Sequence, residues 1–163
     1  MRGKIRGQAF YPFSLTPTLS PLRGEREKEI IMKAAIGHIT LSVSDFERSE
    51  KFYDAIMPLI GFKDVHKDTD GWGAMKLYAQ GEHNLWIRWD KRRKHQKFVR
   101  DAGLDHLAFM VETENQVNEI YVTVQSLGVD ITRTPEKFPE YSSTYYAFYF
   151  RDPDGIPLEV YIK

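Results

Sequence analysis

Two histidines and one carboxylate occupy positions that ordinary packing does not explain. His106 lies in the apolar segment GLDHLAFMV, which is typical of a buried strand, and Glu159 lies in the equally apolar segment PLEVYIK. Burying such groups without partners is costly. A lone core histidine is usually bonded to a backbone carbonyl, but His38 stands in a segment that resembles that of His106. Two imidazoles and a carboxylate form a facial triad that binds a divalent metal and leaves positions open for substrate.

The elements that must position these residues repeat along the chain. The segment GHITLSVSDFERSEKFY at 37–53 matches DHLAFMVETENQVNEIY at 105–121, so His38 and His106 are 68 positions apart. Each copy begins as a strand and turns into a helix. A second repeat, at an offset of 73, places 74–89 over 147–162, and both copies read as strand, turn, strand. Short strands at 62–67 and 129–134 complete two βαβββ units.

Capping residues and apolar spacing define the two helices. Ser44 with Glu47 has the spacing of a capping box, and so has Thr113 with Gln116. Gly61 and Gly128 are natural C-terminal caps. Apolar stripes with spacings of three and four residues predict the buried face of each helix. The stripes are Phe46, Ser49, Tyr53, Ile56 and Ile60 in the first helix and Val117, Ile120, Tyr121, Val124 and Leu127 in the second.

The pattern predicts an α+β fold of two tandem βαβββ modules that form an open, barrel-like cleft. Module one spans 36–90, a linker spans 91–102 and module two spans 103–163. The helical faces are expected outside, with the concave sheet faces lining a shared cleft. Equivalent positions of the modules would then converge, so His38 and His106 are expected to meet beside Glu159. The predicted cofactor is a divalent metal ion, namely Fe, Mn, Ni or Zn.

Three aromatic residues are candidates for the walls and the chemistry of this cleft. Alternation along STYYAFYFR places Tyr145 and Tyr149 on one sheet face, and the turn at 152–155 brings Tyr149 opposite Glu159. The Tyr149 phenol is a candidate catalytic hydrogen-bond or proton donor, and packing against the cleft floor is the alternative. Trp86, which takes the place of Glu159 in module one, is expected to line the substrate cleft together with Tyr145.

Composition excludes several classes of protein. The chain has 163 residues, 42% of them hydrophobic, and a formal net charge of zero, which predicts neither a nucleic-acid nor a membrane partner. The absence of cysteine excludes disulfides and thiolate metal sites. No apolar run approaches the roughly 18 residues of a membrane span. We expect a cytoplasmic protein with a small-molecule substrate. The basic segment at 90–101 is a solvated linker or, alternatively, an electropositive lip for an anionic substrate.

Residues 1–33 differ from the rest of the chain. They are basic and rich in proline, and polar residues interrupt any apolar stretch that a signal peptide would need. The segment LTPTLSPLRGERE resembles the translation of a repeated intergenic element of bacterial genomes, so Met32 is the expected natural start. A disordered or loosely docked arm is the alternative.

Three segments together resemble the vicinal oxygen chelate superfamily, the group of glyoxalases, bleomycin-resistance proteins and extradiol dioxygenases. They are GHITLSVSDFERSEKFYDAIMPLIGF, LDHLAFMV and YYAFYFRDPDGIPLEVY, and the resemblance covers about 34–163. It implies metal ligands at His38, His106 and Glu159. It also implies a metal that grips adjacent substrate oxygens as a Lewis acid or as an iron centre for oxygen. The resemblance favours a homodimer.

The resemblance leaves the reaction open. Trp86 stands where a four-ligand glyoxalase I would have a metal ligand, and an indole cannot ligate. Extradiol dioxygenases and fosfomycin-resistance transferases share the three ligands and the tyrosine at position 149, although neither His83 nor His95 aligns cleanly with a further dioxygenase histidine. We expect a metal-dependent lyase, isomerase or dioxygenase that acts on a small oxygen-rich substrate. A fosfomycin-resistance-like transferase and a metal-free bleomycin-resistance-type binding protein are the alternatives.

Overall fold

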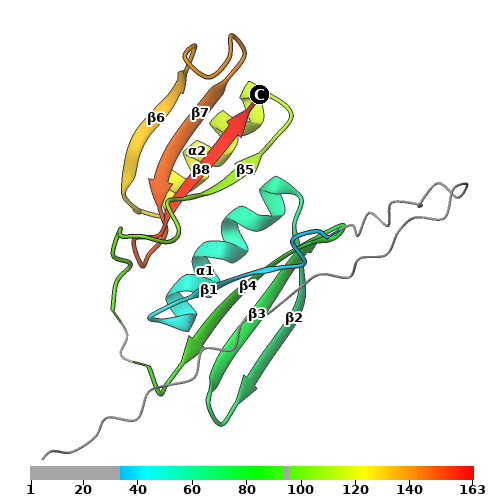
Figure 1. Cartoon of the computed structure of the whole chain (residues 1–163), viewed down its shortest axis with the longest axis vertical. Coiled ribbons are helices and arrows are strands. Elements are labelled where there is room, and N and C mark those ends of the chain that lie inside the picture. Colours follow the sequence, from blue (N-terminus) through cyan, green and yellow to red (C-terminus); the bar gives the residue numbers. More distant parts are fainter. Residues whose placement is uncertain (1–33, 94–95) are drawn as a thin grey trace, which may run out of the picture. The chain divides into compact units, whose positions relative to one another are not determined.

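Residues 34–93 and 96–163, which the computed structural model describes, build two four-stranded sheets and two α-helices (Figure 1). Module one contains β1 (Ile39–Ser42), α1 (Phe46–Ile56), the 3-10 helix η1 (Met57–Ile60), β2 (Lys63–Asp70), β3 (Gly73–Gln80) and β4 (His83–Asp90). Module two contains β5 (Leu107–Met110), α2 (Glu114–Ser126), β6 (Ile131–Lys137), β7 (Tyr146–Arg151) and β8 (Pro157–Ile162). The predicted tail at 1–33 lies outside the described residues.

Both sheets have the same topology. The strand orders are β1-β4-β3-β2 and β5-β8-β7-β6, with the first strand of each module parallel to the last and the other pairs antiparallel. The predicted α+β class with two βαβββ modules is confirmed. Within the part of the chain that the structure describes, no helix has the length and apolar character needed to cross a bilayer.

The N-terminal cap of the helix agrees with the sequence prediction in module two and differs from it in module one. Thr113 and Gln116 form the predicted capping box of α2. The capping box predicted for α1 is wrong, because Asp45 caps that helix by accepting a hydrogen bond from the Arg48 backbone N–H at 3.0 Å. Pro58 lacks the backbone N–H that a regular α-helix needs, so the helical segment continues after Ile56 as the 3-10 helix η1. Gly61 caps the C-terminal end of η1 with a left-handed φ of 84°.

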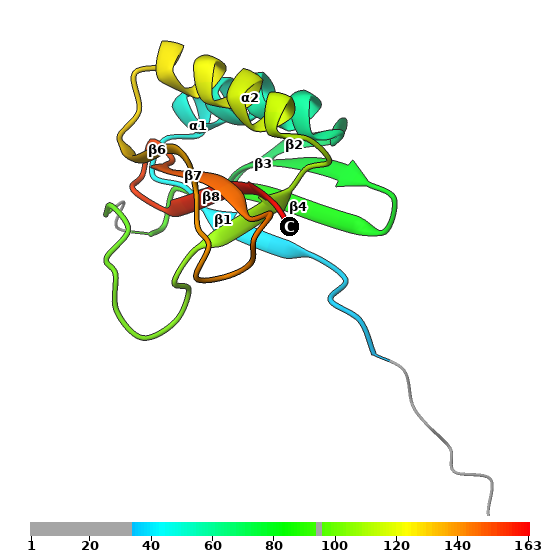
Figure 2. The same cartoon turned by 90° about the horizontal axis from the view of Figure 1, so that it is seen from above.

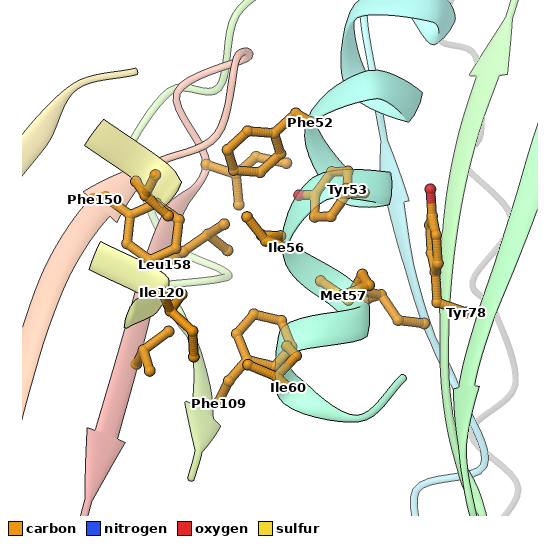
Figure 3. Packing of buried hydrophobic residues seen from close by; sticks show 14 of the residues in the cluster. Phe52, Tyr53, Ile56, Met57, Ile60, Tyr78, Phe109, Ile120, Phe150 and Leu158 are labelled. Atoms are coloured by element: carbon orange, nitrogen blue, oxygen red, sulfur yellow. The ribbon is translucent and has the colours of Figure 1, made fainter. Parts of the chain in front are cut away.

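A single apolar core joins the two modules. The helices α1 and α2 lie on the same side of the sheets (Figure 2) and contact each other. Figure 3 shows Phe52 and Ile56 of α1 pointing toward Phe150 and Leu158 of module two. The helix-bearing sheet faces are therefore buried together within one chain, and the opposite faces of both sheets are left for other contacts.

The turn after β7 links module two to the start of α1. Asp152 accepts hydrogen bonds from the backbone N–H groups of Asp154 and Ile156 at 2.9 and 2.8 Å, which hold the turn. Its second oxygen accepts a hydrogen bond from the Tyr53 hydroxyl of α1 at 3.0 Å. Asp154 accepts from the Ser44 backbone N–H at 2.7 Å and pairs with Arg48 at 2.6 Å. Ser44 therefore belongs to the contact between modules and not to the helix cap.

Burial raises the pKa of Asp152 to about 6, although hydrogen bonds from Ile156 and Tyr53 lower it. The folded state binds this proton more tightly than the unfolded chain, so the stability contributed by the protonated carboxyl is lost as pH rises from about 4 to about 6. Asp152→Asn keeps an acceptor for the two backbone N–H groups and cannot ionise. We expect the unfolding free energy of the variant, relative to wild type, to rise by about 2–3 kcal/mol between about pH 4 and about pH 7.

Urea unfolding at about pH 4, 5, 6 and 7 measures this difference. Asp101→Asn, a change at an exposed carboxylate, is the matched control and should show no such trend. A constant difference between Asp152→Asn and wild type across this range would contradict the raised pKa.

Candidate metal and substrate site

Glu159 is a carboxylate placed in the middle of a buried strand. Its neighbours in β8, Leu158 and Val160, are 0% and 1% exposed and belong to the core that faces the helices. Because side chains alternate along a strand, Glu159 points to the opposite face of the sheet. It is nevertheless only 2% exposed, so its charge depends on partners within the protein.

Two tyrosines and one histidine surround the Glu159 carboxylate. The Tyr145 hydroxyl donates to Oε1 at 2.7 Å. Tyr149 pairs with Glu159 across β7 and β8, which confirms the predicted register. Burial, followed by the hydrogen bond with Glu159, raises the pKa of Tyr145 and of Tyr149 well above the usual range. Both phenols are therefore held protonated and act as donors near the carboxylate.

His106 approaches the other oxygen of this carboxylate. Its Nε2 lies 3.1 Å from Glu159 Oε2, and its Nδ1 lies 2.7 Å from Asp105 Oδ2. The residue directly precedes β5, and its side chain is 39% exposed. The expectation of a buried histidine inside a strand is therefore wrong. Of the strand residues that follow it, only Phe109 is buried, because Leu107 and Phe109 face the core whereas Ala108 and Met110 alternate onto the other sheet face and are exposed.

The imidazole of His106 is thus set between two carboxylates. A neutral ring carries a single N–H, and the contact from Nδ1 to Asp105 has the geometry of a hydrogen bond. The lone pair of Nε2 then faces Glu159 Oε2 at 3.1 Å. A metal ion bound by the two groups would remove the repulsion. The arrangement favours positive charge between His106 and Glu159.

An open cleft of about 420 Å³ lies beside His106. Three arginines reach it from different elements: Arg100 from the linker, Arg133 from β6 and Arg151 from β7. The Nε atoms of Arg133 and Arg151 lie 3.7 Å from Glu136 and 3.2 Å from Asp130. Tyr141 and Tyr149 also line the cleft. Guanidinium groups and aromatic faces together suit a small anion with oxygen donors.

Comparison with known proteins assigns the chain to a family. Residues 35–160 match the Glyoxalase/Bleomycin resistance protein/Dioxygenase superfamily. The chain belongs to this superfamily. The metallothiol transferase FosB of Shouchella clausii is 30% identical over 135 residues, which cover 80% of this chain and 81% of FosB.

Solved structures share the fold of this chain. A glyoxalase/bleomycin resistance protein/dioxygenase domain from Frankia sp. EAN1pec has a TM-score of 0.67 at 22% identity, covering 80% of this chain and 98% of that one. A point mutant of the fosfomycin resistance protein FosX from Listeria monocytogenes has a TM-score of 0.59 at 19% identity, covering 79% and 90%. This FosX mutant was solved with Mn(II) and 1S,2S-dihydroxypropylphosphonic acid.

The third ligand suggested by the resemblance to this superfamily does not join the pair. His38 is exposed and directly precedes β1 in module one. Among residues 34–93 and 96–163, no three His, Asp or Glu side chains gather as a metal site. The expected meeting of His38 with His106 within one chain is therefore not found. The physical reason is that α1 and α2 pack into one shared core on the same side of the sheets, which leaves the opposite sheet faces uncovered within one chain.

In module one, Trp86 occupies the position equivalent to Glu159, and its neighbours across the sheet form a row of side chains. Thr40, Leu77 and Trp86 are register partners across β1, β4 and β3, and His66 of β2 pairs with Leu77. Trp86 is half-buried, and its ring meets the His66 ring edge to face at 6.2 Å. Sequence spacing did not indicate His66, because a bulge between Asp64 and His66 shifts the alternation of β2.

Removing one donor to a buried carboxylate should be measurable as lost stability. Tyr145→Phe deletes the hydroxyl that bonds Glu159, and we expect the unfolding free energy to fall by about 1–2 kcal/mol. Tyr146→Phe is the matched control, since the Tyr146 hydroxyl bonds Asn118 at an exposed position, 3.0 Å away. Urea unfolding near neutral pH measures both, and equal losses in the two variants would contradict the dependence of Glu159 on Tyr145.

Proposed function

We propose that this protein is a divalent-metal-dependent enzyme that acts on a small, anionic, oxygen-rich substrate bound beside His106 and Glu159. The observation that carries the proposal is the imidazole held between two carboxylates, with Nε2 3.1 Å from Glu159 Oε2. A binding protein that sequesters its ligand without metal has no need for this arrangement. The proposal therefore favours an enzyme over a metal-free bleomycin-resistance-type module.

The residues present fit a divalent metal. The Tyr145 hydroxyl donates to Oε1 of Glu159, and Oε2 is directed at His106, where both groups could bind one metal ion. One imidazole nitrogen and one carboxylate oxygen suit Fe, Mn, Ni or Zn. A metal held there would supply Lewis-acid polarisation of substrate oxygens. The FosX structure with Mn(II) supports this choice of metals.

The proposed third ligand is His38 of a second chain. His38 and His106 occupy equivalent positions of the two modules, 68 residues apart. A twofold dimer that sets module one of one chain against module two of the other would bring His38 to the His106–Glu159 pair, and symmetry would create the site twice. Trp86 and His66 would then form the opposite wall of the cleft. This arrangement makes the homodimer a requirement of the site.

The chain's own side chains would bind and orient the substrate. Arg133 and Arg151 offer terminal guanidinium nitrogens to an anionic group, since their Nε atoms face Glu136 and Asp130. Tyr149 is the proposed catalytic donor, because it remains protonated beside Glu159 and lines the cleft. Tyr145 holds the carboxylate in place, and the aromatic rings keep water from part of the cleft.

The relatives favour addition of a nucleophile to an anionic substrate. FosB is named a metallothiol transferase, and FosX was solved with a phosphonate. A glyoxalase-like lyase or an extradiol-type dioxygenase uses the same ligands, so an assay must distinguish among the three reactions. We expect thiol transfer to fosfomycin to exceed conversion of methylglyoxal hemithioacetal or of catechol.

Protein stripped of metal and then loaded with Mn²⁺, Fe²⁺, Ni²⁺ or Zn²⁺ is assayed on these three substrates, with L-cysteine or glutathione as the thiol. Turnover is expected in the loaded protein and absent from Glu159→Gln. Tyr149→Phe should lose about a hundredfold in kcat, and His83→Ala, a change at an exposed residue of β4, should keep full activity. Activity of the stripped protein equal to that of the loaded protein, or no turnover with any metal, would contradict the proposal.

A further inference from the structure

The two predicted histidine ligands, His38 and His106, differ in the residue that precedes each of them. Asp105 precedes His106 and lies 2.7 Å from its Nδ1. The equivalent residue before His38 is Gly37, which has no side chain to offer. Only one of the two equivalent histidines in the described modules therefore has an adjacent carboxylate on its ring.

A third residue holds Asp105. The Arg100 guanidinium donates to Asp105 Oδ1 at 2.5 Å, while Oδ2 faces the imidazole. Each carboxylate oxygen therefore has one partner, and the carboxylate is fixed between the linker and the histidine. The side chains of Arg100 and Asp105 are 61% and 64% exposed, so this pair contributes little to global stability. Its position against the His106 ring indicates a local role instead.

We propose that Asp105 is a positioning residue that fixes the His106 ring and its Nδ1-protonated form, with Arg100 orienting Asp105. This inference rests on the proposed function, in which His106 binds a metal through Nε2. A hydrogen bond on one imidazole nitrogen decides which nitrogen is free to ligate. With the proton on Nδ1 and directed at Asp105, the Nε2 lone pair is aimed at the space beside Glu159. The negative charge of Asp105 also strengthens Nε2 as a donor.

Without Asp105, the geometry favours the opposite form of the ring. Glu159 Oε2 lies 3.1 Å from Nε2 and would accept a proton carried there. The ring would then be blocked for metal binding by its own hydrogen bond. Asp105 thus competes with Glu159 for the single proton of a neutral imidazole, and the shorter contact, at 2.7 Å, is the one to Asp105.

Zinc affinity of the full-length protein, measured by competition with a chromophoric chelator, is the first test. Asp105→Ala should bind Zn²⁺ about 10–100-fold more weakly than wild type. Asp105→Asn keeps an acceptor without the charge and should lose about tenfold, and Arg100→Gln should lose less. Asp101→Asn, the matched control in the same segment, should bind as wild type does. An affinity of Asp105→Ala equal to that of wild type would overturn the inference.

The proton on the ring is the second test and does not depend on metal. Long-range ¹H–¹⁵N spectra of the metal-free protein at mildly alkaline pH should show His106 protonated on Nδ1 in wild type. In Asp105→Ala the proton should move to Nε2. The melting temperatures of wild type and Asp105→Ala should be equal, which shows that the change on the ring does not come from a loss of folding. A wild-type ring protonated on Nε2 alone overturns the role of Asp105, whereas failure of wild type to bind Zn²⁺ overturns the proposed function.

Discussion

The desolvated carboxylate of Glu159 is the constraint on which the site depends. A charge in the middle of a core strand is unfavourable unless every oxygen has a partner. Tyr145 takes one oxygen, Tyr149 lies across the strand pair, and His106 faces the remaining oxygen at 3.1 Å. Since His106 Nδ1 is already hydrogen-bonded to Asp105, the contact between His106 Nε2 and Glu159 Oε2 becomes favourable only with a positive charge between them. In the proposed function, the same feature that costs stability would favour the binding of a cation.

Much of this arrangement could be predicted from the sequence because it is set by local rules. The internal repeat predicted two βαβββ modules, and the structure confirms them. The buried stripe of α1, including Ser49 and Tyr53, follows from helical spacing. The pairing of Tyr149 with Glu159 follows from strand alternation and a strong turn signal. These predictions needed no knowledge of how the modules meet.

The rest depends on tertiary contacts that spacing does not encode. Ser44 is hydrogen-bonded to Asp154, from the far end of the chain, and Asp45 caps α1 in its place. The separation of His38 from His106 follows from which faces the modules bury together. A repeat indicates equivalent positions but not whether they meet within one chain.

Metal binding by mixed chains tests the central claim, a site completed by His38 of a second chain. His38→Ala and Glu159→Gln are each purified, then unfolded together in equal amounts and refolded, and bound Mn²⁺ is counted by electron paramagnetic resonance. Neither variant alone should bind Mn²⁺ tightly. In the mixture, about half of the dimers are mixed and each holds one intact site, so about a quarter of all sites should recover. A site formed within one chain would recover none, and wild-type binding by His38→Ala alone would exclude His38 as a ligand.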